Sequence, residues 1–215
     1  MNQTLQTLEQ SDILAFQWVN GHHAPWLDWV MWVASQPWSW AIVLTAGIIY
    51  MCFHQRVGQW LWVLAGVGLC FLLSDRLSVI CFKDVFCRLR PCHALEDVRM
   101  FQTSCGGLYG FVSSHAANVF ALALFLSLWR RKIRNKNLGM RNSQFSILNS
   151  QFPILLFLWA ILVCYSRPYL GKHYPGDVVC GAALGLLVGT AVFFIIQASE
   201  KWADRLVLQK KTSKR

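Results

Sequence analysis

Three short polar runs interrupt an otherwise apolar sequence, and their residue types together suit chemistry on a phosphate group. They are Lys83-x6-Arg90-Pro91, Ser113-Ser114-His115 and Ser166-Arg167-x5-His173-x3-Asp177. Guanidinium and ammonium groups bind phosphate oxygens, and an imidazole can attack phosphorus or donate a proton. Each run lies at the edge of an apolar segment. We therefore predict that the three runs meet in one phosphate-processing site.

The third run supplies a candidate nucleophile, His173. A carboxylate such as Asp177 on one imidazole nitrogen fixes the tautomer and leaves a free lone pair on the other. The alternative is a His–Asp pair that only caps a helix. Because Pro168 disfavours helical geometry at the residue before it, we expect the preceding helix to end at Arg167, whose side chain would point into the site.

The second run lies where a loop enters an apolar segment. Ser113 is a natural N-cap, and the backbone N–H groups of a helix start bind anions. His115 in the first turn would face the same cavity and protonate the leaving oxygen. The alternative is a plain helix cap without a catalytic role.

The first run adds fixed positive charge. Lys83 and Arg90, together with Arg167, could balance the charge of a phosphoryl transition state, so we predict no metal and no other cofactor. The alternative for Lys83 or Arg90 alone is snorkelling to the membrane interface. Lys172 is either a headgroup contact or part of the site.

The composition predicts an all-α integral membrane protein. The chain is 55% hydrophobic and 14% charged, whereas soluble domains carry about 25% charged residues. Residues 1–37 are rich in Trp but broken by polar residues, so we predict a pair of amphipathic helices in the outer interface, with a sixth span near residues 13–34 as the alternative. Five segments are long enough to cross a bilayer: about 38–54, 57–82, 111–129, 152–167 and 177–198.

The net charge of +10 is concentrated in the loop 130–141 and in the tail 199–215. By the positive-inside rule both lie on the cytoplasmic side, which places residues 83–115 and 166–177 on the outer face. We therefore predict a multi-pass protein of the cytoplasmic (inner) membrane with its site on the outer, periplasmic side. Basic runs can also bind nucleic acid, but beside membrane spans we expect no nucleic-acid partner.

Two cysteines bracket the loop between the first two runs. Cys92 and Cys105 lie on the predicted outer face, where oxidation is allowed, and we predict a disulfide between them. The alternative is two free thiols.

The three runs resemble the motifs of the type 2 phosphatidic acid phosphatase (PAP2) family, which is related in its active site to vanadium haloperoxidases. That family's pattern is Lys-x6-Arg-Pro, then Pro-Ser-Gly-His, then Ser-Arg-x5-His-x3-Asp. The first and third motifs match fully, whereas in the second Val112 replaces the Pro and Ser114 replaces the Gly. The resemblance covers about residues 38–198, which would form a helical bundle.

The resemblance implies a metal-independent phosphatase that acts on a membrane lipid carrying phosphate. It implies that His173 is the nucleophile and forms a phosphohistidine, that Asp177 is its partner, and that His115 is the general acid. The phosphate ligands that it implies are Lys83, Arg90, Ser113, Ser114 and Arg167.

The identity of the lipid is less constrained. Short outer loops leave no extra domain for a large sugar, which favours undecaprenyl diphosphate or a broad range of lipid phosphates. The loop between Cys92 and Cys105 could contact a glycan, so a lipid A phosphatase is the alternative. A haloperoxidase is disfavoured by the membrane spans. A non-catalytic lipid-phosphate-binding or transport protein is disfavoured because His115, His173 and Asp177 are all present.

Overall fold

The described part of the chain is helical. The computed structural model describes residues 3–54, 57–137 and 146–212, and in these ranges it contains no strand longer than an isolated bridge. The elements are α1 (Gln3–Gly21), α2 (Pro25–Ser35), α3 (Pro37–His54), α4 (Val57–Ser78), a π-helical turn η1 (Val79–Lys83), α5 (Asp84–Phe86), α6 (Pro91–Ala94), α7 (Ser114–Asn137), α8 (Ser146–Tyr169) and α9 (Pro175–Thr212). The predicted all-α membrane fold is confirmed.

Helices α3, α4, α7, α8 and α9 occupy the five predicted spans. Three segments of the described chain are long and apolar enough to cross a membrane: Gly58–Phe86, Gln151–Tyr169 and Pro175–Lys210. For α3 and α7 the crossing stays a prediction. Neither α1 nor α2 is among these segments, in keeping with a helical pair outside the bundle.

Three helix ends differ from expectation. Helix α7 does not end near residue 129 but continues through most of the predicted basic loop to Asn137. Helix α8 does not end at Arg167 but continues to Tyr169, because the restriction before Pro168 is a preference that a last turn can override. The turn closes at Gly171, whose φ is +77°, and the Lys172 N–H bonds the Arg167 carbonyl at 3.0 Å. Helix α9 continues through most of the basic tail to Thr212.

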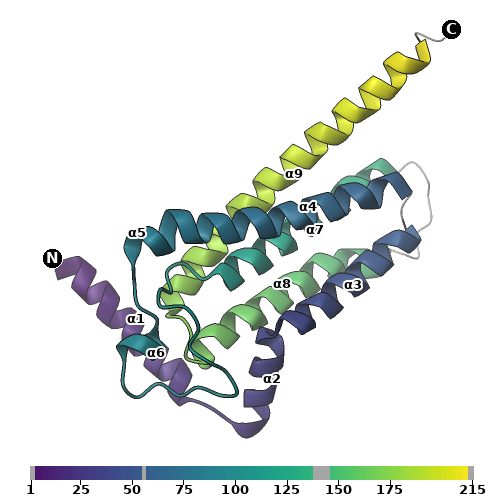
Figure 1. Ribbon diagram of the computed structural model, residues 1–215. Coiled ribbons are helices and arrows are strands. Elements are labelled where there is room, and N and C mark those ends of the chain that lie inside the picture. The colour runs from purple at the N-terminus through teal and green to yellow at the C-terminus, as the bar shows by residue number, and fades with distance from the viewer. Residues whose placement is uncertain (1–2, 55–56, 138–145, 213–215) are drawn as a thin grey trace.

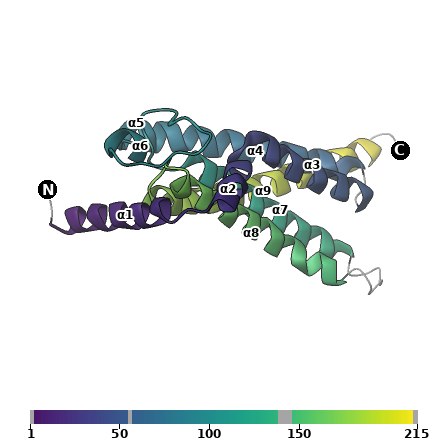
Figure 2. The ribbon, with the colours of Figure 1, turned by 90° about the horizontal axis from the view of Figure 1, so that it is seen from below.

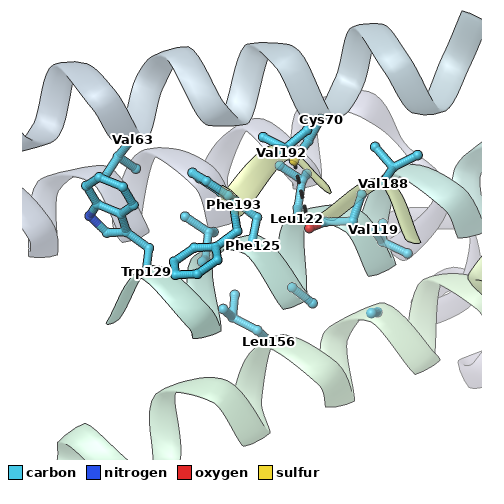
Figure 3. Close-up of a cluster of buried hydrophobic side chains, with 14 of the residues drawn as sticks. Val63, Cys70, Val119, Leu122, Phe125, Trp129, Leu156, Val188, Val192 and Phe193 are labelled. Atoms are coloured by element: carbon cyan, nitrogen blue, oxygen red, sulfur yellow. Dashed lines mark hydrogen bonds between the residues drawn. The ribbon is translucent and has the colours of Figure 1, made fainter. Parts of the chain in front are cut away.

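Helix α7 lies at the centre of the bundle and packs against α4, α8 and α9 (Figures 1 and 2). Its buried face carries Leu122, Phe125 and Trp129, and Figure 3 shows these side chains between those of the neighbouring helices. The Cys70 thiol of α4 lies 3.9 Å from the Ala121 carbonyl of α7. This core fixes the helices whose ends carry the three motifs.

Helices α7 and α9 approach so closely that their contact requires glycine. Gly181, Gly185 and Gly189 recur every four residues along one face of α9. A Cβ atom on these glycines would collide with the carbonyl oxygens of Ser113, Ala117 and Ala121 respectively. The start of α7 therefore lies directly against the start of α9.

The N-terminal helices fold against the end of the bundle that carries the motifs. Asn20 of α1 donates to the Tyr169 carbonyl at 2.9 Å and accepts the Arg99 N–H at 2.9 Å. Asp28 of α2 pairs with the Arg99 guanidinium at 2.6 Å and accepts the Tyr169 hydroxyl at 2.7 Å. The predicted helical pair is confirmed, and its place in the membrane interface stays a prediction.

The segment between α5 and α7 lies at the same end, opposite the C-terminal end of α9 (Figure 1). A disulfide joins Cys92 and Cys105, whose Cα atoms lie 5.9 Å apart, as predicted. An isolated antiparallel bridge pairs Leu89 with Tyr109. Both contacts restrict this long connection.

The close contact of Gly185 with α7 predicts how a substitution there affects stability. Gly185→Ala should force α7 and α9 apart and destabilise the protein by about 1–3 kcal/mol, lowering Tm by several degrees in detergent. The matched control is Gly68→Ala on α4, where an added Cβ meets no atom within 4 Å. Because alanine favours helix over glycine, this control should not lower Tm. Equal Tm values for both variants would contradict the close α7–α9 contact.

Candidate active site

The predicted nucleophile His173 lies in the loop between α8 and α9. Its imidazole is buried, and Nδ1 lies 3.4 Å from Oδ2 of Asp177. The Tyr174 N–H donates to the same carboxylate oxygen at 3.1 Å. Asp177 therefore faces the Nδ1 side of the ring, which leaves Nε2 as the nitrogen available to a substrate.

The surroundings of His173 keep its imidazole neutral. Burial, followed by the guanidinium groups of Arg167 and Arg90, holds the pKa of His173 well below its usual value of 6.5. Burial and nearby positive charge both disfavour the imidazolium. A neutral ring retains the lone pair that a nucleophile needs.

A cavity of about 380 Å³ opens beside His173. It brings together side chains from the end of α4 and η1, the loop after α5, the first turns of α7 and the loop before α9. The predicted site residues that line it are Lys83, Arg90, Ser114, His115 and His173. The other lining residues are Pro37, Trp40, Phe71, Asp75 and Asn118.

The other three predicted residues, Ser113, Arg167 and Asp177, are buried and do not line this cavity. Ser113 Oγ accepts the Ala116 N–H at 3.4 Å, as an N-cap does. Its own N–H bonds the Asp177 carbonyl at 3.0 Å and so ties α7 to α9. The Nε atom of Arg167 has no hydrogen-bond partner among the described residues.

Ser114, which departs from the family pattern, holds the Lys83 ammonium at the cavity. Lys83 Nζ donates to Ser114 Oγ at 2.6 Å, and the Ser78 hydroxyl lies 2.6 Å from the same oxygen. The hydroxyl therefore fills space that a glycine would leave open. Ser78 was not singled out from the sequence, because an isolated serine inside an apolar segment carries no motif.

The loop after α5 presents Arg90 to the cavity. Its Nε donates to the Tyr109 carbonyl at 3.3 Å and its Nη1 to the Cys105 carbonyl at 3.4 Å. A Cβ atom on Gly110 would lie 3.0 Å from Asp177 Oδ2 and 3.2 Å from Arg90 Cγ. The glycine thus lets the loop approach the carboxylate closely.

Lys172 is a further cation beside this group of residues. Its side chain is half-buried, and burial, followed by the charges of Arg167 and Arg90, lowers the pKa of Lys172 to about 8. This lysine therefore loses its charge in mildly alkaline solution.

Besides Ser78, sequence reasoning missed three side chains at or beside the site. The Trp40 ring meets the His115 ring edge-on, with centroids 5.2 Å apart. Arg88 Nη1 lies 2.8 Å from Asp177 Oδ1, and Arg88 Nη2 lies 2.8 Å from Asp12 Oδ2. No sequence signal marks them, because Arg88 is one of six spacer residues and Asp12 lies in an amphipathic helix.

The chemistry of the cavity follows from these side chains. Lys83 and Arg90 can hold anionic oxygens, while the His173 and His115 imidazoles can attack and protonate. No group of three His, Cys, Asp or Glu side chains with the arrangement of a metal site occurs among the described residues. The predicted independence of a metal stays a prediction.

Known proteins share this sequence and fold. A lipid A 4'-phosphatase of Porphyromonas gingivalis is 32% identical over 196 residues, which cover 87% of this chain and 74% of the relative. A lipid A 4'-phosphatase of Bacteroides thetaiotaomicron is 30% identical over 198 residues, covering 89% and 79%. The crystal structure of a transmembrane PAP2 type phosphatidylglycerolphosphate phosphatase from Bacillus subtilis has the same fold, with a TM-score of 0.63 and 22% identity over 91% of this chain and 87% of that one.

The family model that describes the PAP2 superfamily matches residues 59–201. This range contains all three motifs and every residue predicted for the site. The chain therefore belongs to the PAP2 superfamily and is one of its membrane lipid phosphatases.

Proposed function

We propose that this protein removes a phosphate group from a lipid at the outer face of the cytoplasmic membrane, through a phosphohistidine on His173. The observation that carries the proposal is the shared cavity. A neutral His173 with a carboxylate on its Nδ1 side faces the same space as His115, Lys83 and Arg90.

The proposed reaction has two steps. His173 Nε2 forms a bond to phosphorus while the bond to the lipid oxygen breaks, and His115 donates its proton to that oxygen. Water then attacks phosphorus, its proton passes to His115, and the bond to Nε2 breaks to release inorganic phosphate. The dianionic phosphate favours the protonated His115 that the first step requires.

An apolar groove supports a lipid substrate. It has a volume of about 470 Å³ and lies between α3, α4, α7 and α8. Trp159 lines the groove, and its ring meets that of Trp40 with centroids 5.8 Å apart. Trp40 also lines the phosphate cavity. We therefore expect a lipid whose phosphate lies in the cavity to place its hydrocarbon chain in the groove.

We propose a lipid A phosphate as the substrate. Both relatives described above carry that activity in their names and match most of this chain. Undecaprenyl diphosphate, favoured by the short outer loops, is the second candidate, because a prenyl chain also suits the groove.

The central test measures phosphate release in detergent with EDTA present. The substrates are lipid A, undecaprenyl diphosphate, phosphatidate and phosphatidylglycerophosphate. His173→Ala should lose at least about 10³-fold in kcat, because no nucleophile remains. The control His23→Ala removes an exposed histidine of the loop between α1 and α2 and should retain full activity.

Each result of this test bears on a different part of the proposal. Lipid A as the preferred substrate would support the substrate assignment, whereas preference for undecaprenyl diphosphate would replace it. Equal release by wild type and His173→Ala would exclude His173 as the nucleophile. Binding of lipid phosphates without turnover would favour a non-catalytic protein.

The pKa of Lys172 predicts a pH dependence. Since its ammonium attracts phosphate and deprotonates as the pH rises through about 8, kcat/KM of the wild type should decline over that range. Lys172→Arg keeps the charge and should move the decline to higher pH. The control Lys201→Arg, on an exposed position of α9, should follow the wild-type curve. An unchanged profile for Lys172→Arg would separate Lys172 from phosphate binding.

The proposed orientation in the membrane can be tested by labelling cysteines from outside intact cells. All cysteines except Cys92 and Cys105 are first replaced by serine. Asp97→Cys, in the loop that the disulfide closes, should then react with an impermeant maleimide. Asn135→Cys, in the last turn of α7 and within the basic stretch 130–141, should react only after the membrane is permeabilised. Labelling of Asn135→Cys in intact cells would reverse the proposed topology.

A further inference from the structure

Arg88 joins the N-terminal helix to the catalytic carboxylate. It lies within the spacer of the first motif, and its guanidinium bridges two acids from distant parts of the chain. One terminal nitrogen lies 2.8 Å from Asp177 Oδ1 and the other 2.8 Å from Asp12 Oδ2. The guanidinium carbon also lies 4.1 Å from the centre of the Tyr174 ring. Three independent contacts therefore fix this side chain.

The two oxygens of Asp177 have separate partners. Oδ1 accepts Arg88, whereas Oδ2 accepts the Tyr174 N–H and lies 3.4 Å from His173 Nδ1. By holding one oxygen, Arg88 sets the rotation of the carboxylate and directs the other oxygen toward His173. Because the carboxylate is fully buried, removing its charged partner leaves an uncompensated charge. Arg88 does not line the phosphate cavity, so it acts on the site through Asp177.

Asp12 brings helix α1 into this arrangement. Its Oδ1 accepts the N–H of Gly176 at 2.7 Å, one residue before Asp177. A Cβ atom on Gly176 would lie 2.7 Å from Asp12 Oδ2, so the glycine lets the Asp12 carboxylate approach without shifting. One turn further along α1, the buried Phe16 ring packs edge-on against the Tyr174 ring, with centroids 5.5 Å apart. One face of α1 thus covers the start of α9.

We infer that Arg88 is a positioning residue that orients Asp177 toward His173, and that Asp12 holds Arg88 in place. The packing of α1 against the start of α9 is then needed for His173 to act as a nucleophile. It does more than place α1 at the membrane. The inference rests on the proposed role of His173 and adds to it two residues that the family motifs do not specify.

The test compares Arg88→Gln, Asp12→Asn and the double variant with wild type. Partners that orient metal-binding histidines are worth about 10- to 100-fold. We expect a similar factor for Arg88, so Arg88→Gln should lower kcat by that amount with little change in KM. Asp12→Asn should lower kcat by about tenfold, at the lower end of that range. Because Asp12 acts through Arg88, the double variant should be no slower than Arg88→Gln. Arg88→Lys should recover part of kcat, since an ammonium still pairs with Asp177.

The chain offers a matched control at the opposite end of α9. Lys132 pairs with Glu200 of α9 and lies 4.2 Å from the centre of the Trp129 ring, so it combines the same two kinds of contact. Lys132→Gln should lower Tm about as much as Arg88→Gln but leave kcat unchanged. If the two variants lose kcat equally, or if the Arg88 and Asp12 effects are additive, the inference is wrong.

A second measurement uses orthovanadate, an inorganic mimic of the transition state, and needs no lipid. Its affinity by calorimetry should fall about tenfold in Arg88→Gln and stay constant in Lys132→Gln. Wild type that binds vanadate in an Arg88-dependent way but releases phosphate from no lipid would reject the proposed function and retain the inference. Wild type that binds no vanadate would overturn the inference. If Arg88→Gln does not fold, unchanged vanadate affinity in Asp12→Asn would overturn it.

Discussion

The close contact between the backbones of α7 and α9 is the constraint on which the site depends. Three glycines on α9 allow the helix to lie against the carbonyl oxygens of α7. The contact ends where the Ser113 N–H meets the Asp177 carbonyl. It therefore places the second motif beside the third through backbone contacts. A bundle with ordinary helix spacing would separate His115 from His173.

Positive charge is the second organising feature. Lys83, Arg90 and Arg167 gather near His173, and among the described residues no carboxylate lies within ion-pair distance of any of the three. The nearby carboxylate of Asp177 pairs with Arg88 through one oxygen and faces the His173 imidazole with the other. The site thus combines a neutral imidazole with an excess of cations, which is the complement of a phosphate dianion.

The motifs, the all-helical fold and the disulfide could be predicted from the sequence, because each depends on local spacing or on residues at helix ends. His115, His173, Lys83 and Arg90 meet in one cavity since every motif lies at the same end of the bundle. The roles of Arg88 and Asp12 could not be predicted, because their contact requires α1 to fold back over the start of α9. The end of α8 was misjudged since the preference against helix before Pro168 is weaker than the packing of a final turn.

The unbalanced cations also link the occupancy of the site to the stability of the fold. In the empty protein, Arg90 and Lys83 repel each other in a partly desolvated space, and a bound anion relieves that repulsion. Any ligand that binds only the folded state stabilises it as its concentration exceeds Kd. Inorganic phosphate, the product of the proposed reaction, is such a ligand. The same positive charges that attract the substrate therefore also hold the product. Dissociation of phosphate then has a free-energy cost in each turnover.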